Sequence, residues 1–283
     1  GDKEKLIDNI QRNVTGLQHI TFIRQNRPSH TRPIIGIIKR MTAITENILT
    51  ETLLNNFTLR PVEPGIYSVL PDDESGSEYD TQFGFMYDLV ACNPLYNRLI
   101  WGYSINIFPR IAGEALRFGM GGKVLDLGCG SLAFTAAIYS QYSGRPVVLV
   151  DQSLKMLRMG KSRLIKRAGK VPDNIVFLHA DALNLPFRDE AFETVLSENL
   201  LHCLPDTNVL LKRLEKILTK TGKMYFTTLV KNNRIADKYL EALGGSGKLV
   251  SRTVDDHRKI FDQLNIHARY ETQGNMVSVY CGR

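Results

Sequence analysis

The sequence predicts an α/β fold, in which a doubly wound, mostly parallel sheet carries helices on both faces. From about residue 122 onward, short apolar runs of strand length alternate with helix-like stretches, as they do when helical crossovers join parallel strands. The first run leads directly into a glycine-rich turn, which is typical of a strand–turn–helix unit that binds a ligand. The five runs expected to form strands are KVLDL, PVVLV, NIVFL, FETVLS and KMYFTTL.

The helices expected between and after these strands cover residues 153–169, 206–218 and about 253–264. Beyond the last helix, IHARY and MVSVY flank ETQGN, which predicts an antiparallel hairpin that closes one edge of the sheet. The main domain is therefore expected to cover residues 81–283.

Residues 1–80 differ from this pattern and are expected to form a mostly helical N-terminal extension. FTLR and IYSVL flank PVEPG, which is compatible with a hairpin, and the acidic stretch 71–80, PDDESGSEYD, indicates a linker or a long loop. We expect the extension to help form an acceptor pocket or a homodimer contact. Seven residues after Pro33 recur at helical spacing: Ile34, Ile37, Ile38, Met41, Ile44, Ile48 and Thr52.

The composition is that of an ordinary soluble globular protein, with 283 residues, 43% hydrophobic and 23% charged. No apolar run approaches the roughly 20 residues needed to cross a bilayer. The net charge of +7 permits an acidic substrate or nucleic acid without requiring either. Four cysteines without metal-type or redox-type spacing predict free thiols, no metal site and a cytoplasmic location: Cys92, Cys129, Cys203 and Cys281.

The glycine-rich turn, VLDLGCGSLAFTAAI, admits two kinds of cofactor. Gly128, Gly130 and Ala133 satisfy the dinucleotide pattern, with Asp151 at the end of the next strand, so a nicotinamide- or flavin-dependent oxidoreductase is one alternative. Asp126 favours the other cofactor, because a carboxylate beside the turn would repel a pyrophosphate. S-adenosylmethionine carries a sulfonium and an ammonium and no phosphate, so the sequence favours that cofactor.

Three further polar segments are expected at the same edge of the sheet, where ligands of open α/β sheets bind. Asp151 can accept hydrogen bonds from both ribose hydroxyls, or it can cap the helix that begins near Ser153. Asp181 and Ala182 can bracket an adenine amino group. SENLLHCLPD then follows the fourth strand and places four polar residues there: Ser197, Glu198, Asn199 and His202.

Together these segments resemble the class I S-adenosylmethionine-dependent methyltransferases, most closely the ubiquinone/menaquinone C-methyltransferase-like branch (methyltransferase type 11). The motifs that carry the resemblance over residues 122–230 are VLDLGCGS, VDQSLKML, HADALNLPF, SENLLHCLPD and LEKILTKTGKMYFTTL. Residues 86–102, MYDLVACNPLYNRLIWG, are similar to the Tyr-Asp-containing helix that precedes the first strand in that family. The resemblance implies a Rossmann-like, seven-stranded sheet with strand order 3-2-1-4-5-7-6.

The resemblance also implies the cofactor contacts. Glu198 is either a ligand of the methionine ammonium or solvated, and Tyr87 either contacts the cofactor or only packs. Leu132 stands where the family usually has a third glycine, and Lys220, Thr221 and Gly222 replace a Pro-Gly-Gly turn. The resemblance places Asp126, Gly128 and Gly130 at the methionine end, Asp151 at the ribose, and Asp181 with Ala182 at the adenine. Cys129, Gln152, Glu198 and Tyr87 complete the expected cofactor-binding set.

Methyl transfer from a sulfonium requires alignment first, and a base only when the acceptor is protonated. His202 is the candidate base, because its loop borders the expected methyl site; the alternative is a histidine that fills a helix start. Seven aromatic residues in 79–103 suit an apolar acceptor, although core packing explains many of them. They are Tyr79, Phe83, Phe85, Tyr87, Tyr96, Trp101 and Tyr103.

The predicted function is therefore transfer of a methyl group from S-adenosylmethionine, by in-line displacement, to carbon or oxygen of a small, fairly apolar molecule. Two alternatives remain besides the oxidoreductase. The basic helix 153–170 would suit an RNA methyltransferase, although charged helix faces are usually only solvated. The absence of an obvious base also leaves room for a non-catalytic binding protein of the same fold.

Overall fold

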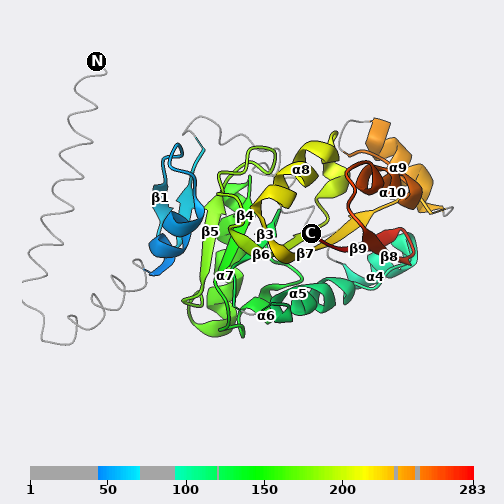
Figure 1. Ribbon diagram of the computed structural model, residues 1–283. Helices are drawn as coiled ribbons and strands as arrows, with labels where there is room; N and C mark the ends of the chain where they lie inside the picture. Colours follow the sequence, from blue (N-terminus) through cyan, green and yellow to red (C-terminus); the bar gives the residue numbers. More distant parts are fainter. Residues whose placement is uncertain (1–43, 71–92, 120, 233–234, 246–248) are drawn as a thin grey trace, which may run out of the picture. The chain divides into compact units, whose positions relative to one another are not determined.

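The computed structural model describes residues 44–70, 93–119, 121–232, 235–245 and 249–283 (Figure 1). All of them belong to one compact unit, Ile44–Arg283. The expected boundary between residues 80 and 81 and the apolar residues from Ile34 to Met41 lie outside the described residues.

The core of this unit is a sheet in which nine described strands follow the order β1-β2-β5-β4-β3-β6-β7-β9-β8. The seven strands of the predicted order 3-2-1-4-5-7-6 are present in that order, which confirms the fold class. They are β3 (Val124–Leu127), β4 (Val147–Asp151), β5 (Ile175–His179), β6 (Phe192–Glu198), β7 (Leu218–Leu229), β8 (Ala268–Gln273) and β9 (Met276–Gly282). The predicted tail hairpin is the antiparallel pair β8–β9, and β9 pairs antiparallel with β7.

Two more strands extend the sheet beyond β5. β1 (Arg60–Glu63) and β2 (Ile66–Ser68) form the hairpin expected around PVEPG, and Gly65 at its turn has φ +83°, which glycine adopts without strain. β2 then pairs parallel with β5, with Ser68 opposite His179. The strand count is therefore nine rather than seven, because part of the N-terminal extension joins the sheet.

Helices cover both faces of the sheet, as predicted. Along β3, Leu125 and Leu127 pack in one apolar cluster with α8, while Val124 faces the other side with Tyr139 of α6. Figure 1 shows α5 and α6 on one side of the strands and α8 on the other. The main helices are α5 (Ile107–Arg117), α6 (Ala136–Tyr139), α7 (Leu154–Ala168), α8 (Thr207–Ile217), α9 (Ala236–Gly245) and α10 (Val254–Gln263).

The helix ends follow local rules. α7 begins at the N-cap Ser153, which accepts the Met156 amide, and it ends at Gly169, whose φ is +77°. α10 begins with a capping box between Thr253 and Asp256. The predicted bounds of α7, α8 and α10 are therefore within about one residue of the observed ones.

Three short pieces and one N-terminal helical segment complete the described helices. α4 (Pro94–Tyr96) continues into the π-helical turn η2 (Asn97–Trp101), and η3 (Leu201–Cys203) follows β6. Residues 44–52 are helical and pack on the same side of the sheet as α8, through Ile48 and Leu49. None of the described helices is long and apolar enough to cross a membrane.

Candidate functional site

The turn between β3 and α6 is held open by glycines and by the neighbouring strand. Gly128 and Gly130 have φ values of +72° and +54°, in the left-handed region that favours glycine. The Gly128 and Cys129 amides donate to the Val150 carbonyl at 2.8 and 2.9 Å. A Cβ on Gly130 would meet no heavy atom within 4 Å, so there is open space beside this residue.

Asp151 joins this turn to the start of α7. Its Oδ2 accepts the Gly130 amide at 2.8 Å, and its Oδ1 accepts the Ser153 amide at 2.9 Å. The N-cap of α7 is Ser153, so the capping role considered for Asp151 belongs to Ser153, two residues further along the chain. Each carboxylate oxygen can accept more than one hydrogen bond, so Asp151 keeps capacity for a ligand.

Asp126, on β3, is a buried carboxylate with an incomplete set of partners. Its side chain is 2% exposed, and the Tyr139 hydroxyl donates to Oδ2 at 2.7 Å. Among the described residues, Oδ1 has no hydrogen-bond partner. Burial raises the pKa of Asp126 to about 7; the hydrogen bond from Tyr139 opposes the rise, and the nearby charge of Asp151 adds to it.

Two more buried oxygens in the described part of the chain lack partners beside Asp126, at the end of β6. They are Oε1 of Glu198 and Oδ1 of Asn199. Burial, and then the charge of Asp126, holds the pKa of Glu198 well above its usual range. Asn199 has φ +59°, a conformation that asparagine tolerates better than most residues.

This group of oxygens is suited to a cation. An unpaired buried carboxylate is costly, and the cost falls when a positive group takes the place of water. An anionic ligand such as a pyrophosphate would instead disfavour the ionised forms of Asp126 and Glu198 still further. The acidic end of the site therefore has the polarity expected of a site for a sulfonium or an ammonium.

The expected ribose and adenine segments lie beside each other. Asp151 is opposite His179 in the β4–β5 register, and its carbonyl accepts the Ala180 amide at 3.2 Å. Asp181 and Ala182 follow directly and are half-buried, and Oδ1 of Asp181 accepts the Leu183 amide at 2.9 Å. The Gln152 side chain is exposed. Tyr87, the remaining expected contact, lies outside the described residues.

His202, the candidate base, is buried in η3. Its Nδ1 accepts the Leu229 amide at 3.3 Å and lies 3.1 Å from the Thr228 hydroxyl. Burial, and then the neighbouring charges of His257 and Arg252, lower the pKa of His202 to about 4. At neutral pH the ring is therefore uncharged, with Nδ1 engaged by β7 and the proton on Nε2.

Leu132, in the place of the family's third glycine, packs away from the glycine turn. It is 1% exposed and belongs to the apolar cluster of α7 and β5. A Cβ added to Gly160 of α7 would lie 3.1 Å from its Cγ, so the larger residue in the turn faces a glycine in the helix. Leu132 carries this packing at φ +55°, a strained value for leucine.

The structure adds site residues that sequence reasoning missed. Tyr139 is the partner of Asp126, and its place inside an apolar helix gave no signal of that role. Asn199 was expected only as one of four polar residues after the fourth strand. Among the described residues, no three His, Cys, Asp or Glu side chains come together as a metal site.

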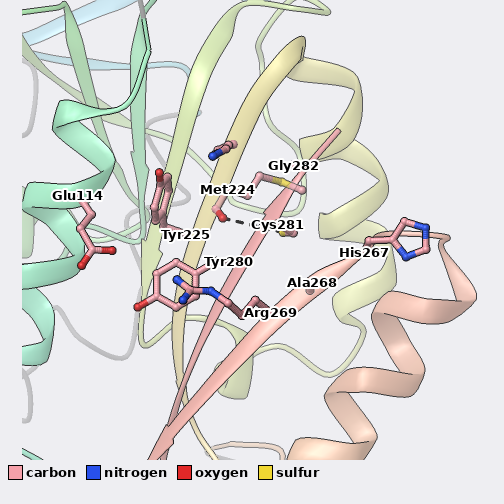
Figure 2. A pocket seen from close by; sticks show the side chains of 10 residues that line it. Glu114, Met224, Tyr225, His267, Ala268, Arg269, Tyr280, Cys281 and Gly282 are labelled. Atoms are coloured by element: carbon pink, nitrogen blue, oxygen red, sulfur yellow. Dashed lines mark hydrogen bonds between the residues drawn. The ribbon is translucent and has the colours of Figure 1, made fainter.

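A hollow of about 600 Å³ lies away from the glycine turn, on the α5 side of β7 and β9 (Figure 2). Lys223, which borders this hollow, lies opposite Thr194 near the start of β6, whereas Glu198 of the acidic group lies at the end of β6. Figure 2 shows Arg269 against the ring of Tyr280, at 4.3 Å from guanidinium carbon to ring centroid. Because this cation already stacks on the protein's own aromatic ring, the hollow does not have the features of a preformed ligand-binding site.

Comparison with known proteins places the site in context. Residues 125–226 match the family model described as a methyltransferase domain. The ubiquinone/menaquinone biosynthesis C-methyltransferase UbiE of Cellvibrio japonicus is 29% identical over 199 residues, which cover 68% of this chain and 79% of that protein. The protein of the same name from Pseudomonas putida strain F1 is 26% identical over 219 residues, 75% of this chain and 83% of its own.

Solved structures show the same fold. Phosphoethanolamine N-methyltransferase 2 of Haemonchus contortus, in complex with S-adenosyl-L-methionine, matches with a TM-score of 0.54 and 20% identity over 70% of this chain and 45% of its own. A methyltransferase of Haloferax volcanii, solved with the Trm112 methyltransferase activator, matches with a TM-score of 0.53 and 16% identity over 73% of this chain and 98% of its own. At these identities the likeness concerns the fold alone.

Proposed function

We propose that this chain, whose residues 125–226 match the methyltransferase-domain family model, transfers a methyl group from S-adenosylmethionine to carbon or oxygen of a small, fairly apolar molecule. The observation that carries the proposal is the acidic group beside the glycine turn. Asp126 and Glu198 each keep a buried oxygen without a described partner, and the cationic end of S-adenosylmethionine supplies the missing charge.

Different residues in and beside the glycine turn would contact different parts of the cofactor. Asp126, Glu198 and the turn Gly128–Cys129–Gly130 would hold the methionine end, since the open space beside Gly130 lets a ligand approach the backbone closely. Asp151 and Gln152 would hold the ribose. The adenine would lie against Asp181 and Ala182, and Tyr87 remains an expected contact.

When bound, S-adenosylmethionine supplies a methyl group on a sulfonium, which the acceptor displaces in line, leaving S-adenosylhomocysteine. The protein's own contribution is to orient the donor and to exclude water. The contacts of His202 favour the alternative in which this histidine only fills a helix start, because Nδ1 accepts the Leu229 amide and Nε2 carries the proton. We therefore propose that any base needed for the acceptor is not His202 in this conformation.

The apolar acceptor is supported by the relatives, whose names place them in ubiquinone and menaquinone biosynthesis as C-methyltransferases. Carbon methylation is therefore the first reaction to test. The RNA alternative is weakened by the contacts of α7. Arg158 and Lys161 pair with Glu63, and Arg163 donates to the Ser131 carbonyl, so part of the basic helix face serves the protein itself.

Calorimetric titration with S-adenosylmethionine, S-adenosylhomocysteine and NADH tests the proposal. Binding of S-adenosylmethionine and S-adenosylhomocysteine, with no binding of NADH, supports the cofactor assignment and justifies assays with quinol-type acceptors. Binding of NADH alone would overturn it in favour of an oxidoreductase. Binding of the methyl donor without turnover on any acceptor or RNA would favour the non-catalytic alternative.

A further inference from the structure

His179, the last residue of β5, links two parts of the molecule that are distant in sequence. The side chain is 2% exposed. Its Nε2 lies 3.0 Å from the Gln152 carbonyl oxygen, and its Nδ1 lies 3.0 Å from Oγ of Ser68. A carbonyl can only accept a hydrogen bond, so Nε2 carries a proton and donates it to Gln152. The other nitrogen faces the hairpin that extends the sheet.

The contact to Gln152 acts on the peptide that positions Asp151. The Gln152 carbonyl and the Ser153 amide belong to one planar peptide unit. That Ser153 amide donates to Oδ1 of Asp151 at 2.9 Å, while Oδ2 holds the Gly130 amide. Fixing the Gln152 carbonyl therefore fixes the direction of the Ser153 amide and, through it, the orientation of the Asp151 carboxylate.

The contact to Ser68 fixes the histidine from the other side. Ser68 is fully buried at the end of β2 and stands opposite His179 in the parallel register. The same hairpin reaches α7, because Glu63 accepts hydrogen bonds from Lys161 at 2.8 Å and from Arg158 at 3.1 Å. The hairpin thus contacts α7 directly through Glu63, and it reaches the Asp151 turn through His179.

We propose that His179 is a positioning residue for cofactor binding, and that it couples the β1–β2 hairpin to the turn that carries Asp151. Residues 60–68 then belong functionally to the cofactor site, although they lie outside the matched methyltransferase domain. The inference rests on the proposed function, because it concerns the affinity for the same cofactor.

Three substitutions at one position separate positioning from packing. His179→Gln keeps a donor at about the place of Nε2, His179→Asn keeps a polar group near Nδ1, and His179→Phe keeps only the ring. We expect His179→Gln to bind S-adenosylhomocysteine within about twofold of the wild type. His179→Asn and His179→Phe should bind at least about fivefold more weakly, because one hydrogen bond that orients Asp151 is lost.

The whole 283-residue chain is titrated with S-adenosylhomocysteine by calorimetry, and the melting temperature of each variant is recorded. His257→Gln is the matched control, since His257 is an equally buried histidine on α10. It is expected to change the melting temperature without changing the affinity. Ser68→Ala should weaken binding less than His179→Phe, and the double variant should bind like His179→Phe alone.

The outcomes separate the two proposals. If the wild type does not bind S-adenosylhomocysteine, the proposed function fails. If the wild type binds and all three His179 variants bind equally well, the function stands and the positioning role is wrong. Loss of affinity in His179→Gln equal to that in His179→Asn would also overturn the role assigned to the Nε2 donor.

Discussion

Replacing Asp126 with asparagine tests the acidic group most directly, because it removes the charge and keeps the shape. Burial raises the pKa of Asp126 from 3.8 to about 7. At one pKa unit per 1.36 kcal/mol, the ionised side chain lowers the free energy of unfolding of the ligand-free protein by on the order of 4 kcal/mol at pH 8. A buried amide with an unpaired N–H costs about 2 kcal/mol, so Asp126→Asn should stabilise the ligand-free protein by about 2 kcal/mol.

The sign and the pH range follow from proton linkage. Between pH 3.8 and about 7, the folded protein binds more protons at this group than the unfolded chain does. Stability from this group is therefore full below pH 3.8, falls as the pH rises and levels off above about 7. The advantage of Asp126→Asn should thus be visible at pH 8 and should vanish near pH 5.

Cofactor binding should change in the opposite direction. A charged hydrogen-bond partner contributes about 1.5–3 kcal/mol, so Asp126→Asn should weaken S-adenosylmethionine binding at least about tenfold at pH 8. S-adenosylhomocysteine lacks the sulfonium and should lose less. Urea unfolding at pH 5 and pH 8, together with calorimetric titration, measures both effects. Asp173→Asn is the control, since its exposed carboxylate pairs only with Lys170 among the described contacts.

One pair of results would refute this reasoning. If Asp126→Asn binds S-adenosylmethionine as tightly as the wild type and has the same stability at both pH values, the carboxylate is neither strained in the ligand-free protein nor used by the cofactor. Greater stability with unchanged binding would keep the burial argument and remove Asp126 from the cofactor site.

Three further predictions concern other parts of the site and its support. Asp151→Ala should weaken S-adenosylhomocysteine binding at least about tenfold by calorimetry, because it removes the acceptor of two turn amides as well as the ribose ligand; unchanged affinity would contradict this. Leu132→Gly should lower the free energy of unfolding by about 2 kcal/mol without improving cofactor affinity. The relief of backbone strain at φ +55° offsets only part of the cost of the cavity left against Gly160. Tighter cofactor binding would show that the leucine obstructs the site. Glu193→Ala should lower the free energy of unfolding, measured with urea, by about 3 kcal/mol and leave cofactor affinity unchanged, because the buried guanidinium of Arg145 loses its carboxylate partner at 3.2 Å. A loss below about 1 kcal/mol would show that water screens this ion pair.

Much of the fold could be predicted because its signals are local. The apolar runs of β3 to β7 are buried on both faces, so they appear in the sequence as continuous hydrophobic segments between amphipathic helices. The bounds of α7 and α10 depend on caps within a few residues, and Ser153 and Thr253 supply them. The hairpin β1–β2 was also visible as a local turn, but its partner strand was not.

The candidate site divides in the same way. The sequence alone predicted that Asp126, the glycine turn, Asp151, Asp181 and Glu198 lie at or near the carboxyl ends of parallel strands, and these ends meet at one edge of a sheet. It could not show the contacts that depend on distant segments. Packing alone decided that Tyr139 pairs with one oxygen of Asp126, and that Gly160 makes room for Leu132. It also decided that His179 joins Ser68 to Gln152, since residues 111 and 27 positions apart meet only after the chain has folded.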